Sequence, residues 1–202
     1  MRAASRPPAR TFTETARRAQ IVQAAIAVIA EAGYKSATFA QIARHAGLSS
    51  TGLISYHFDG RDELIREVVA DILTKLGTHM QERMAATRNA TEALRTYIEA
   101  SAEFTGGHRA EMRALLAIFL GGGFPYDATT DQAVTSPVAD ILRWGQGSGE
   151  FRRFDPTIMA TLVQRAVDGL PFLLDANPGV DPLAYGDEVA TAFALATRAG
   201  GR

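Results

Sequence analysis

The sequence contains no cysteine and no long apolar run, and these absences remove several classes of protein. Without cysteine the chain can form no disulfide framework, no thiolate nucleophile and no thiolate metal site. No stretch approaches the roughly 18 consecutive apolar residues of a membrane-spanning helix. The N-terminal basic residues have no apolar segment behind them, which argues against a secretory signal. A cytoplasmic protein is the simplest interpretation.

Complete motifs for catalysis or cofactor binding are missing as well. The four histidines have no metal-ligand spacing. Residues 145–149 (Gly-Gln-Gly-Ser-Gly) match neither a nucleophile elbow nor a dinucleotide-binding loop. Residues 121–123 (Gly-Gly-Gly) lack the Gly-Lys-Ser/Thr ending of a phosphate loop. We therefore expect no enzyme, no metal and no cofactor, although an all-α enzyme acting on a small apolar molecule stays open.

Charge is distributed unevenly along the chain. Residues 1–61 hold eight basic and three acidic side chains, a net charge of +5, whereas residues 62–202 hold thirteen basic and nineteen acidic ones, a net charge of −6. A basic end on an acidic body favours a polyanionic partner for that end. Random scatter of charge is the alternative.

The first third of the sequence predicts short helices behind a disordered basic arm over residues 1–12. A first helix is expected from Thr13 to Ala32, with Gly33 as the residue that ends it. Thr38 is expected to cap a second helix over 39–46. Gly47 permits the positive φ of a sharp turn, and Leu48 is expected to pack beneath it. Ser49 or Ser50 is then expected to cap a third short helix, which ends near Phe58.

The rest of the sequence also has helical periodicity, interrupted by glycine and proline, and shows no β alternation. A long fourth helix with one apolar stripe is expected from Arg61 to about Ala86. The later helices are expected at Thr91–Thr105, Arg109–Leu120, Asp131–Gly147, Pro156–Asp175 and Pro182–Arg198. The predicted fold is all-α, with about nine helices.

Two short helices joined by a glycine-containing turn, behind a basic leader, are typical of a DNA-reading helix-turn-helix. The second of them would present small polar side chains to base edges in the major groove, namely Ser50, Thr51, Gly52 and Ser55. Tyr56 and His57 could donate hydrogen bonds to phosphates. The alternatives are a packed core aromatic for Tyr56 and a capping or surface role for His57.

Several short elements within residues 18–64 resemble the N-terminal domain of the tetracycline-repressor (TetR) family of bacterial regulators. They stand in matching order and spacing: Ala24-Ala25, Glu31-x-Gly33-Tyr34, Thr38, Ile42-Ala43, Ala46-Gly47-Leu48-Ser49, Tyr56-His57-Phe58 and Asp62-Glu63-Leu64. The resemblance covers about a quarter of the chain. It departs from most members by one additional residue within 49–52, and by Arg61 where many members carry lysine.

The resemblance implies a DNA-binding domain over residues 13–60 and a ligand-binding and dimerisation domain over 61–202. It implies that Thr38, Ala40 and Gln41 lie at the DNA-facing start of the second helix. Ser50, Thr51, Gly52 and Ser55 would then lie in the groove, while Tyr56, His57 and Arg61 would hold the phosphate backbone. For Arg17 and Arg18, phosphate contact and simple solvated charge are equally open.

Family members use the last two helices for dimerisation, so a homodimer through about 157–174 and 183–197 is expected. Small side chains would let these helices approach closely in the dimer, namely Ala190, Ala194 and Thr197 beside Phe193. A dimer suits a palindromic operator, because one helix-turn-helix reads only one half-site. Burial of the same helices in the core of one subunit is the alternative.

An inducer pocket is the other family property of this region. Its candidate lining is the set of apolar residues on the middle helices: Phe104, Met112, Leu116, Phe119, Trp144, Met159, Val163 and Phe172. Arg165 and Asp168 interrupt an apolar helix, and a polar residue there could orient a ligand. Ordinary core packing or surface exposure is the alternative for each of these residues.

The resulting hypothesis is a repressor that releases a palindromic operator on binding a small, mostly apolar molecule. The long fourth helix would act as a lever between body and DNA-binding end, and the ligand would favour a wider spacing of the two reading helices. The rival interpretation is a helical protein that compacts DNA with weak sequence preference and steep salt dependence.

Overall fold

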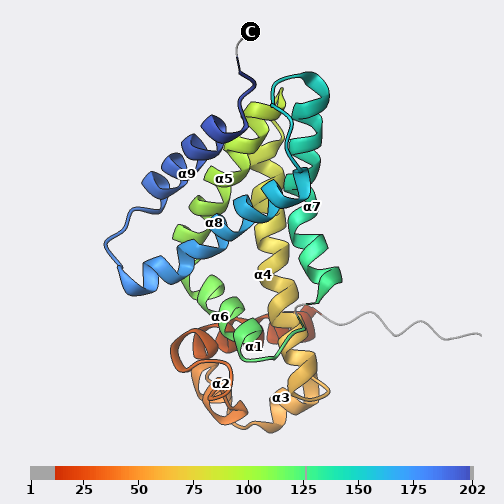
Figure 1. Cartoon of the computed structure of the whole chain (residues 1–202). Coiled ribbons are helices and arrows are strands. Elements are labelled where there is room, and N and C mark those ends of the chain that lie inside the picture. Colours follow the sequence, from red (N-terminus) through yellow and green to blue (C-terminus); the bar gives the residue numbers. More distant parts are fainter. Residues whose placement is uncertain (1–11, 126, 201–202) are drawn as a thin grey trace, which may run out of the picture.

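The computed structural model describes residues 12–125 and 127–200, and this part of the chain folds into nine helices without strands (Figure 1). The helices are α1 (Phe12–Ala32), α2 (Phe39–His45), α3 (Gly52–His57), α4 (Arg61–Met84), α5 (Ala90–Gly107), α6 (Arg109–Leu120), α7 (Ala128–Ser148), α8 (Pro156–Ala176) and α9 (Pro182–Thr197). The all-α prediction is confirmed. The predicted arm over residues 1–12 lies outside the described residues, except for Phe12. No helix in the described ranges is long and apolar enough to cross a membrane.

Helix ends differ from the predictions where a side chain caps an additional turn. The Asn89 side chain accepts a hydrogen bond from Glu92 N, so α5 begins at Ala90. Asp127 accepts from Thr130 N in the same way, so α7 begins three residues earlier than expected. Each cap satisfies a backbone N–H that the first turn leaves unpaired. Apolar periodicity locates the body of a helix and misses these polar first turns.

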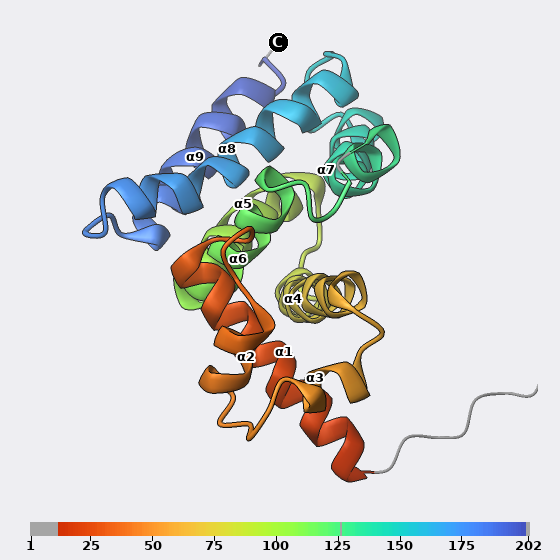
Figure 2. The same ribbon diagram turned by 90° about the horizontal axis from the view of Figure 1, so that it is seen from below.

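The helices α1, α2 and α3 form a small head at one end of the molecule, and α4 runs from this head into the body (Figures 1 and 2). The core of the head combines residues of α1, α2 and α3 with the first half of α4. Ala114, Leu115 and Ile118 of α6 belong to the same buried cluster. The core of the head therefore continues into a helix of the body.

The body is organised around α5, which packs against α4, α7, α8 and α9. Contact between α5 and α9 is close because small residues face each other: a Cβ on Gly186 would lie 2.9 Å from the Cβ of Ala102. Ala190 and Thr197 of α9 are buried within this single chain. The prediction that they lie in the dimer interface is wrong, because their side of α9 already packs on α5.

Candidate DNA-binding surface

The start of α2 is held by a reciprocal cap. Gln41 N donates to Thr38 Oγ1 at 3.3 Å, and Thr38 N donates to Gln41 Oε1 at 2.9 Å. Thr38 is thus the N-cap predicted from the sequence, in a capping box that satisfies two backbone donors. Thr38 and Ala40 are exposed, while Gln41 is half-buried. Since Gln41 Oε1 already accepts hydrogen bonds in the cap, only the amide nitrogen of this side chain is left to donate to a base.

The turn between α2 and α3 depends on one glycine and one anchoring leucine. Gly47 has φ +65°, which L side chains rarely adopt. Leu48 N donates to Ala43 O at 2.8 Å, and the Leu48 side chain packs against the head core as predicted. The predicted cap by Ser49 or Ser50 is wrong: Thr51 is the N-cap residue of α3 and makes no side-chain cap hydrogen bond.

The predicted groove residues share one property, exposure to solvent. Ser50, Thr51, Gly52 and Ser55 are all exposed, on or next to the first turn of α3. Their small side chains would let α3 approach the floor of the major groove closely. Tyr56 follows them and is 79% exposed, so it is no core aromatic. Their exposure is compatible with the predicted DNA contacts, which stay a prediction.

His57 is half-buried and lies edge-on to Tyr56, with ring centroids 5.0 Å apart. Within the described ranges, its Nδ1 atom is the one buried side-chain nitrogen or oxygen without a hydrogen-bond partner. Because Nδ1 is buried, only Nε2 can reach a group outside the protein. This geometry is compatible with one phosphate contact from the ring.

Arg18 is buried, contrary to both predictions for it. Its guanidinium donates to the carbonyl of His57 and lies 3.0 Å from Glu63 Oε1. A second carboxylate, that of Glu67, lies 3.2 Å away, and the guanidinium covers the ring of Phe58 at 4.0 Å. Arg18 therefore joins α1 to the end of α3 and the start of α4, and is neither a phosphate contact nor a solvated charge.

Arg61 also points inward in this structure. Its NH1 donates to Ala37 O at 2.5 Å, its NH2 donates to Tyr34 O, and its guanidinium lies over the Tyr34 ring at 4.7 Å. The planar fork of arginine suits two carbonyls at once, as lysine would not. The expected hold on the phosphate backbone stays a prediction, and the contacts observed here tie α4 to the α1–α2 connection.

Sequence reasoning did not single out two exposed cations on the head, Lys35 and Arg44. Lys35 lies in the α1–α2 connection and Arg44 in the last turn of α2. Both were counted only in the charge of residues 1–61, and that uneven charge was the signal available for them. Exposed cations beside a reading helix suit phosphate, which favours long flexible side chains.

The apolar residues predicted to line an inducer pocket are not brought together. Trp144 and Phe172 are 45% and 50% exposed, so they line no internal cavity. Phe119 packs edge-on to Phe124 at the head, 5.6 Å between centroids, and Phe104 stacks on His108. Met159 and Val163 are buried in the core of the body, and Leu116 is half-buried on α6.

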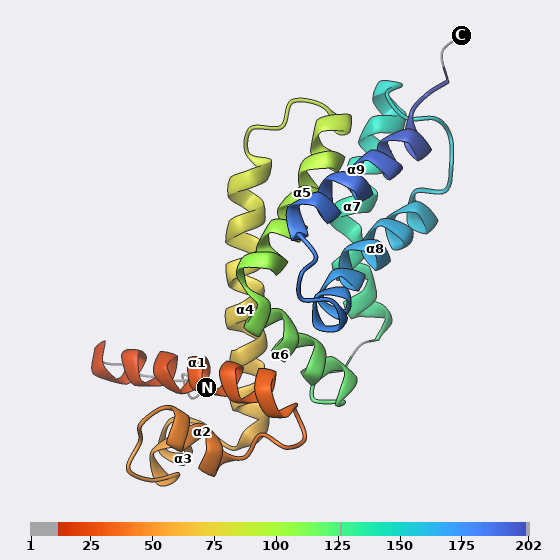
Figure 3. The ribbon, with the colours of Figure 1, turned by 90° about the vertical axis from the view of Figure 1, so that its left-hand side faces the viewer.

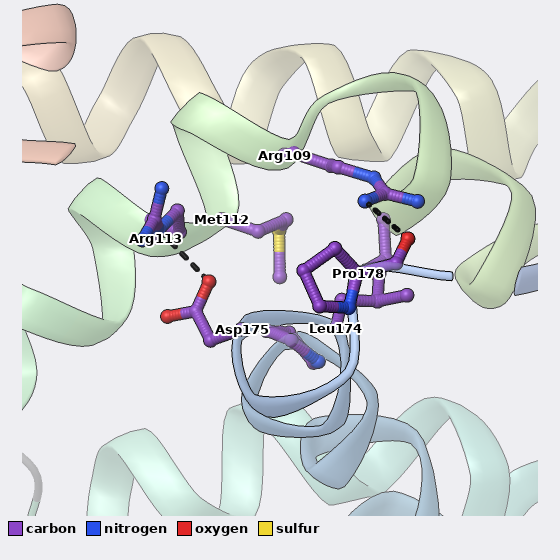
Figure 4. A pocket seen from close by; sticks show the side chains of 8 residues that line it. Arg109, Met112, Arg113, Leu174, Asp175 and Pro178 are labelled. Atoms are coloured by element: carbon purple, nitrogen blue, oxygen red, sulfur yellow. Dashed lines mark hydrogen bonds and ion pairs between the residues drawn. The ribbon is translucent and has the colours of Figure 1, made fainter. Parts of the chain in front are cut away.

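One member of the predicted set, Met112, does line a pocket. This pocket of about 150 Å³ lies between α6 and α8 (Figure 4). Arg113 Nε contacts Asp175 Oδ1 at 2.9 Å across it, and Arg109 NH1 reaches Pro178 O at 3.4 Å. Its wall therefore combines apolar surface with two guanidinium groups and one carboxylate.

A polar network crosses the apolar body near the predicted interruptions. Tyr97 Oη donates to Gln164 Oε1 at 2.9 Å, and Gln164 Nε2 donates to Asp168 Oδ1 at 2.8 Å. Burial raises the pKa of Tyr97 to about 12, and burial likewise raises the pKa of Asp168. Arg165 is at the surface, 2.8 Å from Asp131. Arg165 NH1 also donates to Asp168 Oδ2 at 3.2 Å, so the network runs from Tyr97 through Gln164 and Asp168 to Arg165 at the surface.

The fold and this surface define a helical protein with a helix-turn-helix head on a helical body. A sequence model described as "Bacterial regulatory proteins, tetR family" matches residues 21–68. The HTH-type transcriptional regulator BetI of Cronobacter sakazakii is 36% identical over 162 residues, which cover 79% of this chain and 76% of that protein. The chain belongs to the tetR family, whose members are transcriptional regulators and not enzymes.

Other relatives match over a smaller part of their length. BetI 2 and BetI 1 of Chromohalobacter salexigens are 43% and 33% identical, but the chain spans only 36% and 51% of them. Among solved structures, the ketosteroid transcriptional regulator KstR2 of Mycobacterium tuberculosis aligns with a TM-score of 0.75 at 20% identity, covering 91% of this chain and 96% of that one. A tetR-family protein of Rhodococcus RHA1 aligns at 0.77 and 19%, covering 92% and 98%. These structures establish the shared fold.

Proposed function

We propose that this protein is a homodimeric, sequence-specific DNA-binding repressor that releases a palindromic operator when it binds a small molecule. The observation that carries this proposal is the exposed row of Ser50, Thr51, Gly52 and Ser55, followed by an exposed Tyr56. The side chains of this row face solvent and not the core of the head. It suits the major groove, where small side chains allow close approach and a phenol can bind phosphate.

Dimerisation is supported by apolar side chains left exposed on α8 and α9. Ile158, Leu162 and Phe172 of α8 are 62%, 53% and 50% exposed, and Leu183 and Leu195 of α9 are 61% and 62% exposed. These two helices lie next to each other on one side of the body (Figure 1). An apolar surface of this kind is typical of an interface. Covering it with a second copy would also supply the second reading head that a palindrome needs.

A ligand-responsive repressor is supported by the pocket between α6 and α8. The apolar side chains of Met112 and Leu174 suit an apolar ligand body, while Arg109 at the wall suits a polar or anionic end. The pocket lies on α6, and α6 also contributes to the head core. A ligand that favours one position of α6 would shift the population of head positions, and hence the affinity for DNA.

The test is a gel-shift titration with DNA flanking this protein's own gene, using wild type and Tyr56→Phe at two salt concentrations. Tyr56→Phe removes only an exposed hydroxyl, so folding should be unaffected. If each subunit loses one phosphate hydrogen bond, affinity should fall by roughly 10-fold per dimer. The matched control is Thr129→Val, which removes an exposed hydroxyl from α7 in the body.

Each outcome of this titration has a defined meaning. Tight binding to one fragment that resists competitor DNA and weakens only in Tyr56→Phe supports the proposal. Binding of every fragment with a steep salt dependence would instead favour the protein that compacts DNA. Equal affinities of wild type and Tyr56→Phe would contradict the contact assigned to Tyr56.

A further inference from the structure

Tyr34 lies where the body, the head and the start of α4 meet. It belongs to the α1–α2 connection, is half-buried and packs against the head core. Figure 3 shows the C-terminal end of α6 close to this connection. Its ring lies beside both the Arg61 guanidinium at the start of α4 and the glycine segment that follows α6.

The backbone of Gly121 and Gly123, directly after α6, packs closely against the Tyr34 ring. A Cβ added to Gly121 would lie 2.5 Å from Tyr34 Cδ1, and one added to Gly123 would lie 2.6 Å from Tyr34 Cε2 and 2.8 Å from its hydroxyl oxygen. Real Cβ atoms essentially never come this close to another heavy atom. At Gly123 the Tyr34 ring alone therefore excludes a side chain, while at Gly121 the added Cβ would also lie 2.7 Å from Ala117 O.

This glycine segment is also fixed to α6. Gly121 N donates to Ala117 O at 2.9 Å, and Gly123 N donates to Ile118 O at 2.8 Å. Gly122 has φ +75°, the left-handed conformation commonly found just after a helix. The segment must therefore move together with α6, since these hydrogen bonds make it a continuation of the last turn.

On the head, Tyr34 is linked directly to the elements that carry the candidate DNA surface. The Arg61 guanidinium stacks on its ring and donates to the carbonyls of Tyr34 and Ala37. Arg61 is the first residue of α4, and Ala37 directly precedes Thr38, the N-cap of α2. A displacement of Tyr34 therefore acts on the start of both helices.

We propose that Tyr34 is a positioning residue for DNA binding: held by Gly121 and Gly123 of the body, it sets the orientation of the reading head through Arg61. Close-packed contacts transmit a shift, because there is no free volume to absorb it. The inference rests on the proposed DNA-binding function. It assigns a role to the contact between the end of α6 and the head, at residues that contact neither DNA nor ligand in the proposed function.

The test introduces a single methyl group at the joint. Gly123→Ala should displace the Tyr34 ring and lower operator affinity by roughly 2- to 30-fold, while the melting temperature changes little. Gly147→Ala in α7 is the matched control, because a Cβ at that position meets nothing within 4 Å. In a Tyr34→Ala background, Gly123→Ala should have no additional effect on affinity, since the ring it displaces is absent.

A second measurement separates positioning from stability. The chain has no cysteine, so Glu31→Cys at the exposed end of α1 provides one spin label per subunit. Gly123→Ala should change the label-to-label distance distribution of the dimer, and Gly147→Ala should not. If Gly123→Ala fails to fold, Tyr34→Leu takes its place, and the same loss of affinity is expected.

The outcomes distinguish this inference from the proposed function. If wild type binds no specific DNA, the proposed function fails and the label distances alone decide the inference. If wild type binds its operator and Gly123→Ala or Tyr34→Leu binds equally well, with unchanged distances, the positioning role is wrong. Additive losses in the double variant would also overturn it, because the two residues would then act separately.

Discussion

At the scale of single residues, the contacts of two arginines give them a structural role that their charge alone does not indicate. Arg18 and Arg61 are part of the basic charge of the N-terminal third, yet both guanidinium groups bind carbonyls inside the head. Burial of a charge is costly unless it is paired and hydrogen-bonded. Arg18 meets that condition through Glu63 and Glu67, while the half-buried Arg61 is hydrogen-bonded to two carbonyls. Both arginines therefore support the candidate DNA-binding surface from inside the head.

Replacement of Arg18 should therefore destabilise the protein. Arg18→Met keeps much of the apolar stem but removes the hydrogen bond to the His57 carbonyl and the ion pairs to Glu63 and Glu67. We expect the free energy of unfolding to fall by about 3 kcal/mol. Urea unfolding followed by circular dichroism measures this loss. Arg17→Met is the control, because Arg17 is one residue earlier, is only half-buried and bonds within its own helix to Gln20. A loss no larger than that of the control would show that the buried contacts contribute little.

At the scale of helices, the start of α5 depends on a residue from a distant loop. The carboxylate of Glu150 accepts hydrogen bonds from Thr91 N at 2.9 Å, Thr91 Oγ1 at 2.8 Å and Ser148 Oγ at 2.8 Å. Desolvation raises the pKa of Glu150, but these hydrogen bonds and one from Ala90 N outweigh it and lower the pKa to about 2. The α7–α8 connection is thereby linked to the N-terminus of α5.

The lowered pKa of Glu150 predicts a pH dependence of stability. In the unfolded chain its pKa is near the ordinary value of 4.5, so the stabilisation is fully present above that pH and is lost as the pH falls toward 2. Glu150→Gln should cost about 1 kcal/mol at pH 7. Urea unfolding of both proteins at pH 7, 5 and 3.5 should show this difference shrinking at low pH. A constant difference, or an equal effect of the exposed control Glu188→Gln, would contradict the assignment.

At the scale of the whole molecule, the two sides of α9 have different roles. One side is buried on α5 through Gly186 and Ala190, and the other exposes Leu183 and Leu195. Together with the exposed apolar residues of α8, this outer side is the proposed dimer interface. A second copy would cover side chains that the single chain leaves in water.

A charge in this proposed interface should separate the subunits. Leu162→Glu places one carboxylate per subunit in an apolar contact, and we expect the dimer dissociation constant to rise by roughly 100-fold. Size-exclusion chromatography with light scattering at several concentrations measures the change, and operator affinity should fall with it. Leu73→Glu is the control, because Leu73 is an exposed leucine on α4, outside the proposed interface. If Leu162→Glu leaves the mass unchanged, the interface lies elsewhere.

The sequence by itself determined where the helices lie and that Thr38 caps α2. It also determined the turn at Gly47 and the run of small polar residues at the start of α3. These features depend on neighbours within a few residues, so periodicity, capping and backbone freedom are enough to predict them. Helix ends were less accurate where Asn89 and Asp127 add a polar first turn.

Only the tertiary structure decided which cations are free, which apolar residues are exposed and where a pocket lies. Arg18 and Glu63 are in contact although 45 positions separate them in the sequence, and Tyr34 and Gly121 lie side by side although 87 positions separate them. The identity of a charged residue does not tell whether its side chain faces solvent or a carbonyl. The identity of an apolar residue likewise does not tell whether it packs on α5 or on a second subunit. The partner decides the role, and partners distant in sequence are set by packing.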